Sequence, residues 1–281
     1  MVVTRYESAE SFLRVAGPLL MLAEAENNLI IGIAQGLTRN LAAARNPYLA
    51  TAGNAAGVLA CAIYIAPFKL VITRANREPI VALAEDAFSV APDIEGVTGP
   101  ARSATDFAVA WRRLTGTEPT LGMRMRIHEI RTVTESELPA PAGHFRPAIR
   151  DDLDLLIGWT GTFVTEARIP EPVNAEAVVS DAIQRGRLHL WDAGAPVSMA
   201  AWTGKTPSGV RINFVYTPPE LRGHGFATAC VSALTCQQLA LGSTFCWLYT
   251  DLSSAASPNI FKRIGYRPVS DVSEYYLKTV P

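Results

Sequence analysis

Helical and strand-like patterns of apolar residues alternate in the second half of the chain. Ala227, Val231, Leu234 and Leu241 are spaced so that they fall on one face of a helix, which predicts a long helix over 225–241. Short apolar runs between turns rich in Gly, Pro and Ser predict strands before and after it. The predicted strands are 145–149, 188–192, 197–202, 210–217, 245–250, 266–269 and 273–277, and the other helices are 152–166, 174–184 and 258–264. This order predicts a mixed α/β (α+β) fold with a largely antiparallel sheet.

The first half has a less regular pattern. The predicted helices are 8–24, 28–40, 79–88 and 103–114, and the predicted strands are 48–52, 58–66, 69–73 and 123–133. The order helix, helix, three strands, helix, helix, strand is similar to the order in the second half, although no sequence identity is visible between the halves. Two interpretations stay open: a degenerate copy of the same fold, or an unrelated α/β domain.

A stretch without apolar periodicity separates the two halves. Residues 134–143 (TESELPAPAG) contain two acids, two prolines and several small residues. The prolines favour an extended connection. We therefore expect two domains, 1–133 and 144–281, joined by a linker over 134–143. The alternative is an ordinary surface loop within a single domain.

The composition fits a folded protein without a highly charged partner. Of its 281 residues, 49% are hydrophobic and 18% are charged, which is enough apolar material for a buried core. The 25 Lys and Arg nearly balance the 26 Asp and Glu, so no cationic excess indicates a nucleic acid or an anionic membrane as partner. We therefore expect a small-molecule site.

The sequence predicts neither a targeting signal nor a metal site. The first ten residues, MVVTRYESAE, carry acids where a signal peptide needs a cationic and then an apolar run, so we expect a cytoplasmic protein without membrane spans. The histidines are scattered, and the cysteines form no CxxC pair. Cys230, Cys236 and Cys246 fall on a predicted helix and strand, where we expect buried apolar roles.

The segment that most strongly suggests chemistry joins a predicted strand to the long helix. In Arg222-Gly-His-Gly-Phe-Ala227, two glycines let the backbone turn sharply and approach a ligand closely. The free amide groups of the helix's first turn, together with Arg222 and His224, favour binding of a phosphate group. The spacing is not that of a P-loop, and it matches the Rossmann glycine motif only weakly.

The same segment resembles a family motif. The pattern Arg-x-x-Gly-x-Ala at 222–227, after a strand and before a helix, resembles the acyl-CoA signature of the GCN5-related N-acetyltransferases, the GNAT superfamily. The stretch FKRIGYRPV at 261–269 is similar to the family's second motif, and the similarity spans about 145–277. It implies a GNAT-type sheet flanked by helices over 144–281, with 1–133 as a degenerate GNAT-like or accessory α/β domain.

The resemblance implies an acyltransferase of the N-acetyltransferase type. Such an enzyme would move an acetyl group from acetyl-CoA directly to the primary amine of a small-molecule or peptide acceptor. We expect it to use no metal and to bind neither a nucleic acid nor a membrane. A homodimer stays possible. The amide of Val215 would polarise the thioester carbonyl, and Asp251 would accept the amine proton. For Asp251 the alternative is a turn or helix-capping acid. The residues implied in CoA binding are Val215, Tyr216, Thr217, Arg222, Gly223, His224, Gly225, Phe226, Ala227, Asn259 and Phe261.

The short helix after the site departs from the family's pattern. Ser-Pro-Asn-Ile-Phe at 257–261 stands where the family has Ser-Asn-x-x-Tyr, so Phe261 replaces a Tyr that commonly protonates the leaving thiolate. A thiol with a pKa of about 8.5 can leave as thiolate near neutral pH without an acid. Tyr249 and Tyr266 are candidates to replace the acid, although a buried structural role fits each of them better. The departure keeps a second hypothesis open, a non-catalytic acyl-CoA-binding or sensing protein.

Other residues have both a functional and a structural interpretation. Glu166 lies where the family binds acceptors, or it is a solvated acid at a helix end. Trp159, Phe163 and Trp202 line an acceptor pocket or pack in the core. The first half has RANREP at 74–79 where a phosphate loop would fall, and because this stretch lacks glycine we expect no CoA binding there. We expect the first half to cover the acceptor side or to form a dimer face.

Overall fold

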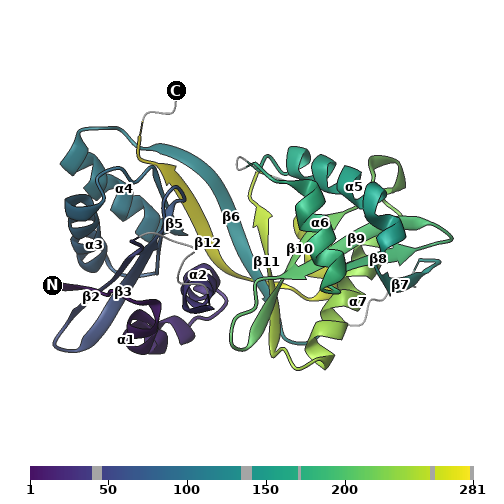
Figure 1. Ribbon diagram of the computed structural model, residues 1–281, viewed down its shortest axis with the longest axis horizontal. Helices are drawn as coiled ribbons and strands as arrows, with labels where there is room; N and C mark the ends of the chain where they lie inside the picture. Colours follow the sequence, from purple (N-terminus) through teal and green to yellow (C-terminus); the bar gives the residue numbers. More distant parts are fainter. Residues whose placement is uncertain (40–45, 134–140, 170–171, 254–256, 279–281) are drawn as a thin grey trace. The chain divides into compact units, whose positions relative to one another are not determined.

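The chain divides into two compact units. The computed structural model describes residues 1–39, 46–133, 141–169, 172–253 and 257–278, and of 257–259 only the backbone. Unit 1 consists of Met1–Ile127 and the end of the chain from Val269, and unit 2 consists of His128–Pro268. Figure 1 shows both units and labels many of their helices and strands.

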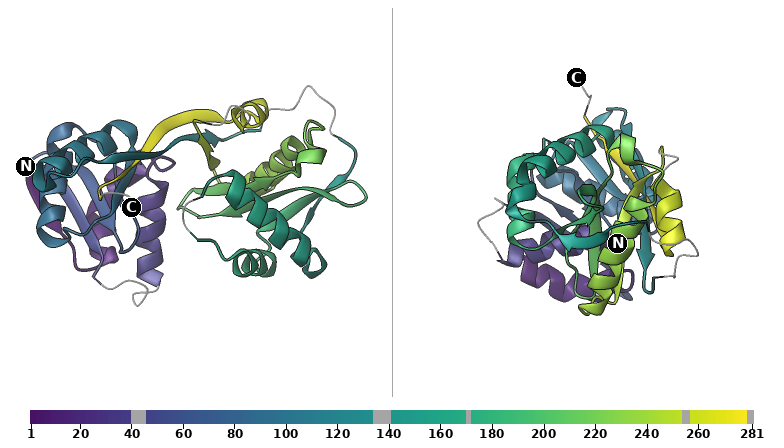
Figure 2. Two further views of the ribbon diagram at one scale, coloured as in Figure 1. Left: turned by 90° about the horizontal axis from the view of Figure 1, so that it is seen from above. Right: turned by 90° about the vertical axis from the view of Figure 1, so that its right-hand side faces the viewer.

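Unit 1 is a sheet with two helices on each face. Its strands, in the order β1-β2-β3-β4-β5-β12-β6 across the sheet, are β1 (Val2–Arg5), β2 (Tyr48–Asn54), β3 (Gly57–Tyr64), β4 (Leu70–Ile72), β5 (Gly96–Pro100), β12 (Arg267–Tyr276) and β6 (Thr120–Ile130). Helices α1 (Ala9–Met21) and α2 (Asn28–Arg39) share one apolar core with the sheet. Helices α3 (Arg77–Val90) and α4 (Ala101–Thr115) share a second core (Figures 1 and 2).

Unit 2 has the same layers. Its strands, in the order β6-β11-β10-β9-β8-β7, are β7 (His144–Pro147), β8 (Leu188–Asp192), β9 (Pro196–Thr203), β10 (Gly209–Tyr216) and β11 (Phe245–Asp251), with β6 at the end. Helices α5 (Leu153–Glu166) and α6 (Ala175–Gln184) pack on one face. Helices α7 (Phe226–Ala240) and α8 (Ser257–Ile264) pack on the other, and the 3-10 turns η2 (Arg150–Asp152) and η3 (Pro219–Leu221) precede α5 and α7.

The two halves of the chain repeat one order of elements. Each half runs strand, two helices, three strands, helix, strand, helix, strand. In each half the last of the three consecutive strands is parallel to the strand that follows the next helix, namely β4 to β5 and β10 to β11. The other pairs given by the backbone hydrogen bonds are antiparallel. The predicted mixed, largely antiparallel sheet flanked by helices is therefore confirmed. Of the two interpretations of the first half, a copy of the same fold is the one that the structure supports.

The last strands of the two halves are exchanged. By element order, β6 is the last strand of the first half and β12 is the last strand of the second. In unit 1, however, β5 pairs with β12, and in unit 2 β11 lies next to β6. A buried hydrogen bond between His128 Nε2 of β6 and Thr250 Oγ1 of β11, 3.1 Å long, belongs to this second contact. Each half thus completes its sheet with the other half's last strand.

The structure differs from the predicted elements in three places. Strands β1 and β5 are present but were not predicted, and the two strands predicted over 266–269 and 273–277 form the single strand β12. The predicted linker lies largely outside the described residues. The domain ranges 1–133 and 144–281 stay a prediction, although the contacts within the chain assign the residues from Val269 onward to unit 1.

Within the described part of the chain, no helix has both the length and the apolar character that crossing a lipid bilayer requires.

Candidate functional site

The predicted phosphate-binding segment lies at the surface of unit 2, between β10 and α7. Residues 222–225 are all exposed, and α7 begins at Phe226 directly after Gly225. Gly225 is the N-cap residue and has no side chain, so no capping group accepts from the amides of the first turn. These amides, at the positive end of the helix dipole, are available to an anion.

Both glycines of this loop have a left-handed backbone. The φ angle is 83° at Gly223 and 82° at Gly225, a conformation that costs other residues about 1–2 kcal/mol. A Cβ atom built on either glycine meets no described atom within 4 Å. Glycine is therefore required here by the path of the backbone, and the space above it is open to a ligand.

Arg222 is held at the start of the loop by three contacts. Its Nε donates to the carbonyl oxygen of Thr217 at 2.9 Å, and its Nη2 donates to both carboxylate oxygens of Glu166 at 3.0 and 2.7 Å. The guanidinium also lies over the ring of Tyr216, 5.7 Å from the centroid. The Arg222 and Glu166 side chains are 47% and 42% exposed, so the ion pair is weak and can be exchanged for a stronger anion. Glu166, one candidate for the acceptor side, thus contacts the residue predicted to bind phosphate.

A β-bulge shapes the end of β10. Pairing with β9 is regular as far as Asn213 and shifts before Tyr216, and Phe214 between them has a φ of 48°. A positive φ is unusual for a Phe and indicates local strain, which often occurs at functional sites. The ring of Phe214 packs against Phe163 of α5, with 5.4 Å between the centroids. The bulge re-aims the backbone of Val215, which is the predicted donor to the thioester carbonyl.

The two residues after the bulge are fixed to β9. The hydroxyl of Thr217 donates to Ser198 Oγ at 2.9 Å. The hydroxyl of Ser198 in turn donates to the carbonyl oxygen of Tyr216 at 3.1 Å. The side chain of Thr217 is buried. A ligand at this edge would therefore meet backbone groups rather than the Thr217 side chain.

Strands β10 and β11 part beyond Arg211. Their parallel pairing begins at Gly209–Phe245 and ends at Arg211–Trp247, although β10 continues to Tyr216 and β11 to Asp251. Over the rest of their length the two strands form no ladder with each other. In α/β folds, an opening at the carboxyl ends of parallel strands and next to a helix N-terminus is a common ligand site.

The predicted residues beyond β11 lie in other surroundings. Phe261 is 7% exposed and packs edge-on against Tyr266, with 5.9 Å between the centroids. The hydroxyl of Tyr266 is hydrogen-bonded to Thr235 Oγ1 at 2.9 Å, and burial raises the pKa of Tyr266 well above its usual value. Both rings belong to the core of unit 2, which agrees with the structural interpretation of Tyr266. The side chain of Asn259 lies outside the described residues.

Asp251, the predicted base, closes a local turn. Its carboxylate accepts from the backbone amide of Ser253 at 2.8 Å and from the Ser253 hydroxyl at 2.7 Å. This is the pattern of an Asx turn, which was the alternative interpretation of Asp251. Its role as a base stays a prediction.

The aromatic residues considered for an acceptor pocket do not share a face. Trp159 packs on Tyr216, with 5.9 Å between the centroids, and Phe163 packs on Phe214, so both attach α5 to β10. Trp202 instead packs against the core on the α7 side. Together these three residues do not line a single pocket.

Comparisons with known proteins support the fold of the chain. Residues 190–276 match the family model described as FR47-like protein. A GCN5-related N-acetyltransferase from Sphaerobacter thermophilus has a TM-score of 0.63 at 15% identity, covering 100% of this chain and 96% of the other. A GNAT-family acetyltransferase from Colwellia psychrerythraea has a TM-score of 0.57 at 12% identity, covering 99% and 100%. A tandem GNAT protein from the clavulanic acid biosynthesis pathway has a TM-score of 0.54 at 11% identity, covering 100% and 99%.

The chain has a tandem GNAT fold. The whole-length similarity to a tandem GNAT protein and the repeated element order together include the first half in this fold. No curated protein sequence matches the chain.

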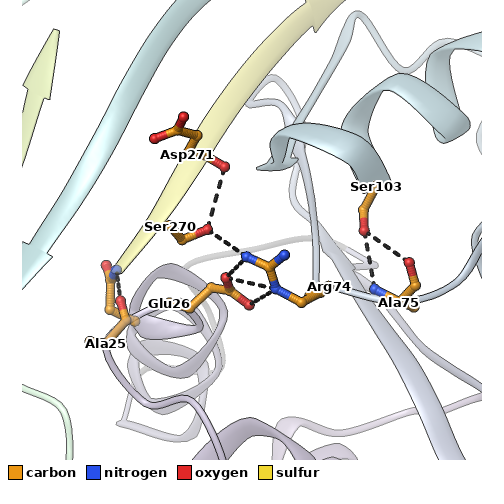
Figure 3. A network of polar contacts seen from close by, with 8 residues as sticks. Ala25, Glu26, Arg74, Ala75, Ser103, Ser270 and Asp271 are labelled. Atoms are coloured by element: carbon orange, nitrogen blue, oxygen red, sulfur yellow. Dashed lines mark hydrogen bonds and ion pairs between the residues drawn. The ribbon is translucent and has the colours of Figure 1, made fainter. Parts of the chain in front are cut away.

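In the first GNAT unit, the connection that matches the β10–α7 loop is short. It consists of residues 73–76 between β4 and α3 and has no glycine. Arg74 in this connection forms an ion pair with the largely buried Glu26 and donates to Ser270 Oγ at 3.0 Å (Figure 3). A cavity of about 570 Å³ lies beside it, lined by residues from the N-terminal ends of α3 and α4. Arg74, like Arg222, is paired with a carboxylate, and the expectation that this unit does not bind CoA stays a prediction.

Within the described residues, neither a metal site nor the cysteines Cys230 and Cys246 indicate a second type of catalysis. No three His, Cys, Asp or Glu side chains gather there as a metal site would require. Burial raises the pKa of the Cys230 and Cys246 thiols to about 12, so neither is a nucleophile near neutral pH. Cys236 is exposed, and the buried role predicted for it is wrong because it lies on the solvent side of α7.

Proposed function

We propose that this chain is an N-acetyltransferase that moves the acetyl group of acetyl-CoA directly to a primary amine of a small-molecule or peptide acceptor. The observation that carries the proposal is the exposed loop 222–225, whose left-handed glycines lead into the uncapped N-terminus of α7 beside the opening between β10 and β11. A helix end that favours an anion thus lies close in sequence to a strand edge without ladder pairing. Acyl-CoA has matching parts, a pyrophosphate and an amide-containing arm.

The residues present fit acyl-CoA. In the proposal, the amides of Phe226 and Ala227 bind the pyrophosphate, with charge from Arg222 and His224. The open space above both loop glycines admits phosphate oxygens close to the backbone. The backbone of 215–217 offers hydrogen bonds to the amide-containing arm. Arg222 becomes available once its exposed ion pair with a carboxylate is exchanged for the phosphates.

The reaction forms one bond and breaks another. The amine nitrogen attacks the thioester carbon, the C–N bond forms, the C–S bond breaks, and the amine loses a proton. The N–H of Val215, re-aimed by the bulge at Phe214, is our candidate donor to the carbonyl oxygen on which negative charge develops. Asp251 is our candidate for accepting the amine proton, directly or through a water molecule.

The leaving group needs no acid from the protein. A thiol titrates at about pH 8.5, so the thiolate is an adequate leaving group near neutral pH. Phe261 at the family's Tyr position is therefore compatible with catalysis. Its packing in the core gives no reason to prefer a non-catalytic acyl-CoA-binding protein.

The proposal is tested by calorimetric titration with acetyl-CoA, followed by measurement of thiol release across a panel of primary amines. We expect binding and amine-dependent thiol release. Tight binding without release by any amine would instead support a binding or sensing role. Absence of binding would refute the assignment of the loop 222–225 as the phosphate site.

A further inference from the structure

Arg211 of β10 is a half-buried cation without an anionic partner among the described residues. Its Nε is inaccessible to solvent and makes no hydrogen bond within the described part of the chain. The contact that the guanidinium does make is with an aromatic ring, because it lies over Tyr249 of β11 at 4.9 Å from the centroid. Arginine keeps its charge in proteins, so the inaccessible part of this guanidinium cannot become neutral by losing a proton.

A second buried donor lies beside Arg211. Trp247 is 1% exposed, and its indole N–H also has no hydrogen-bond partner among the described residues. Arg211 and Trp247 are paired in the register of the two parallel strands, so their side chains leave the sheet on the same face. Two neighbouring N–H donors on one face both lack an acceptor. Such groups are rare in native proteins, and a catalytic role or a bound water molecule or ion is among their explanations.

The acids on the neighbouring strands are engaged elsewhere. By strand alternation Asp251 is on the same face of β11, and its carboxylate is bonded to Ser253. Glu129 of β6 accepts from Arg131 Nε at 3.1 Å. The described carboxylates on these strands therefore provide no acceptor for Nε of Arg211.

The position of Arg211 relates it to the proposed reaction. Arg211 and Trp247 are the last pair before β10 and β11 part, so they lie at the closed end of the opening. From the phosphate loop at 222–227, the proposed path of the amide-containing arm leads back along 215–217 toward lower residue numbers. The reacting end of acyl-CoA would therefore face the Arg211 end of β10.

The chemistry of the two donors defines the ligand group. A guanidinium presents several N–H groups in a planar fork that fits the two oxygens of a carboxylate. The indole supplies one more donor and, with Tyr249, an aromatic wall. We propose that Arg211 and Trp247 bind a carboxylate of one of the two substrates. This inference rests on the proposed acyl transfer, and the carboxylate belongs either to the amine acceptor, as in an amino acid, or to the far end of the acyl group, as in succinyl-CoA.

Kinetics with matched substrates distinguish these two sources. In one arm, acetyl-CoA is combined with amino acids and with the amines that correspond to them without the carboxylate. In the other arm, one carboxylate-free amine is combined with acetyl-CoA and with succinyl-CoA. We expect the carboxylate-bearing member to be preferred by at least about thirtyfold in kcat/KM in one of the arms, as for a charged hydrogen-bonded pair. Equal kcat/KM values in both arms would overturn the proposal.

Two variants test the residues themselves in the full-length chain. Arg211→Met keeps the volume and removes the charge, and we expect it to bring the preference close to one. Trp247→Phe keeps an aromatic ring and removes the N–H, and we expect it to reduce the preference about fivefold, as for one lost hydrogen bond. In both variants the affinity for acetyl-CoA, measured by calorimetry, serves as the control for folding and is expected to stay unchanged. A preference that survives both substitutions would overturn the proposal.

Binding measurements separate this inference from the proposed function. If no amine reacts with either acyl-CoA, the transferase proposal fails, and calorimetric titration of the same amino acids, amines and succinyl-CoA replaces the kinetics. Binding of the carboxylate-bearing members that Arg211→Met abolishes would support the carboxylate site by itself. Equal binding of members with and without a carboxylate, or binding of neither, would overturn it.

Discussion

Replacing Gly225 by alanine tests the phosphate loop most directly. The φ angle of 82° places Gly225 in the left-handed region, and a Cβ there meets no described atom within 4 Å. The substitution therefore destabilises the protein through the backbone alone, by about 1–2 kcal/mol. For binding, the new methyl group lies at the N-terminus of α7. The loss of one charge-assisted amide–phosphate hydrogen bond, about 1.5–3 kcal/mol, corresponds to a roughly 10- to 150-fold weaker affinity for acetyl-CoA.

The chain offers a matched control at the other end of the same helix. Gly242 follows α7, has a φ of 99°, and also has no described atom within 4 Å of a built Cβ. Gly242→Ala should therefore lower the free energy of unfolding by a similar amount while leaving acetyl-CoA binding unchanged. The assays are thermal unfolding for stability and calorimetric titration for affinity. If both variants lose stability alike and both bind acetyl-CoA like the unmodified protein, α7 does not provide the phosphate site.

Further predictions concern ion pairs and a buried tyrosine. Glu166→Gln releases Arg222 from an exposed ion pair worth about 0–1 kcal/mol, so calorimetry should show acetyl-CoA affinity raised by up to about fivefold; weaker binding would contradict this. Hydrogen bonds from Arg146 lower the pKa of Asp152, so their contribution to stability is present above the usual pKa of about 3.9 and is lost as pH falls through the lowered value. Asp152→Asn should cost roughly 3 kcal/mol near neutral pH in denaturant unfolding and flatten this acid dependence. Tyr266→Phe should cost about 1–2 kcal/mol of stability with turnover unchanged, whereas a large loss of rate would make it the missing acid.

Local sequence patterns predict most elements of the fold, and β5 shows where they fail. Residues Gly96–Pro100 read GVTGP, and glycine and proline are depleted in strands. The structure nevertheless needs glycine in this strand, because a Cβ on Gly99 would lie 2.7 Å from the side chain and the carbonyl oxygen of Ile72. The close approach of β4 thus selects the residue type that removes the local strand signal.

The break predicted within β12 has a related cause. Ser270 and Asp271 are turn-forming residues, so the local pattern indicates two short strands. In the structure β12 is continuous through these residues. Arg126 of the neighbouring strand β6 donates to both carboxylate oxygens of Asp271, at 2.5 and 2.9 Å. A contact between positions this far apart in the chain leaves no local signal. The exchange of β6 and β12 escapes sequence analysis for the same reason.

The candidate site also contains residues that can be recognised from the sequence and residues that only the structure brings to attention. The loop 222–227 is recognisable because its chemistry depends on consecutive residues, namely two glycines and a helix start. The bulge at Phe214 is not, because a large aromatic residue disfavours positive φ and is held there by packing. Arg211 and Trp247 become notable only once the register of β10 and β11 is known. In the sequence, nothing distinguishes Arg211 from an arginine on a solvated strand face.

The exchanged last strands have a consequence for any attempt to cut the protein in two. A fragment that ends before residue 134 lacks β12 between β5 and β6, and a fragment that starts after 143 lacks β6 beside β11. Each fragment alone would have an unpaired strand edge, which is prone to aggregation. Produced together, the fragments can supply each other's missing strand and reassemble without a covalent connection. The two halves are thus interlocked by their sheets, and a cut in the connecting chain would leave them associated until one of the sheets unfolds.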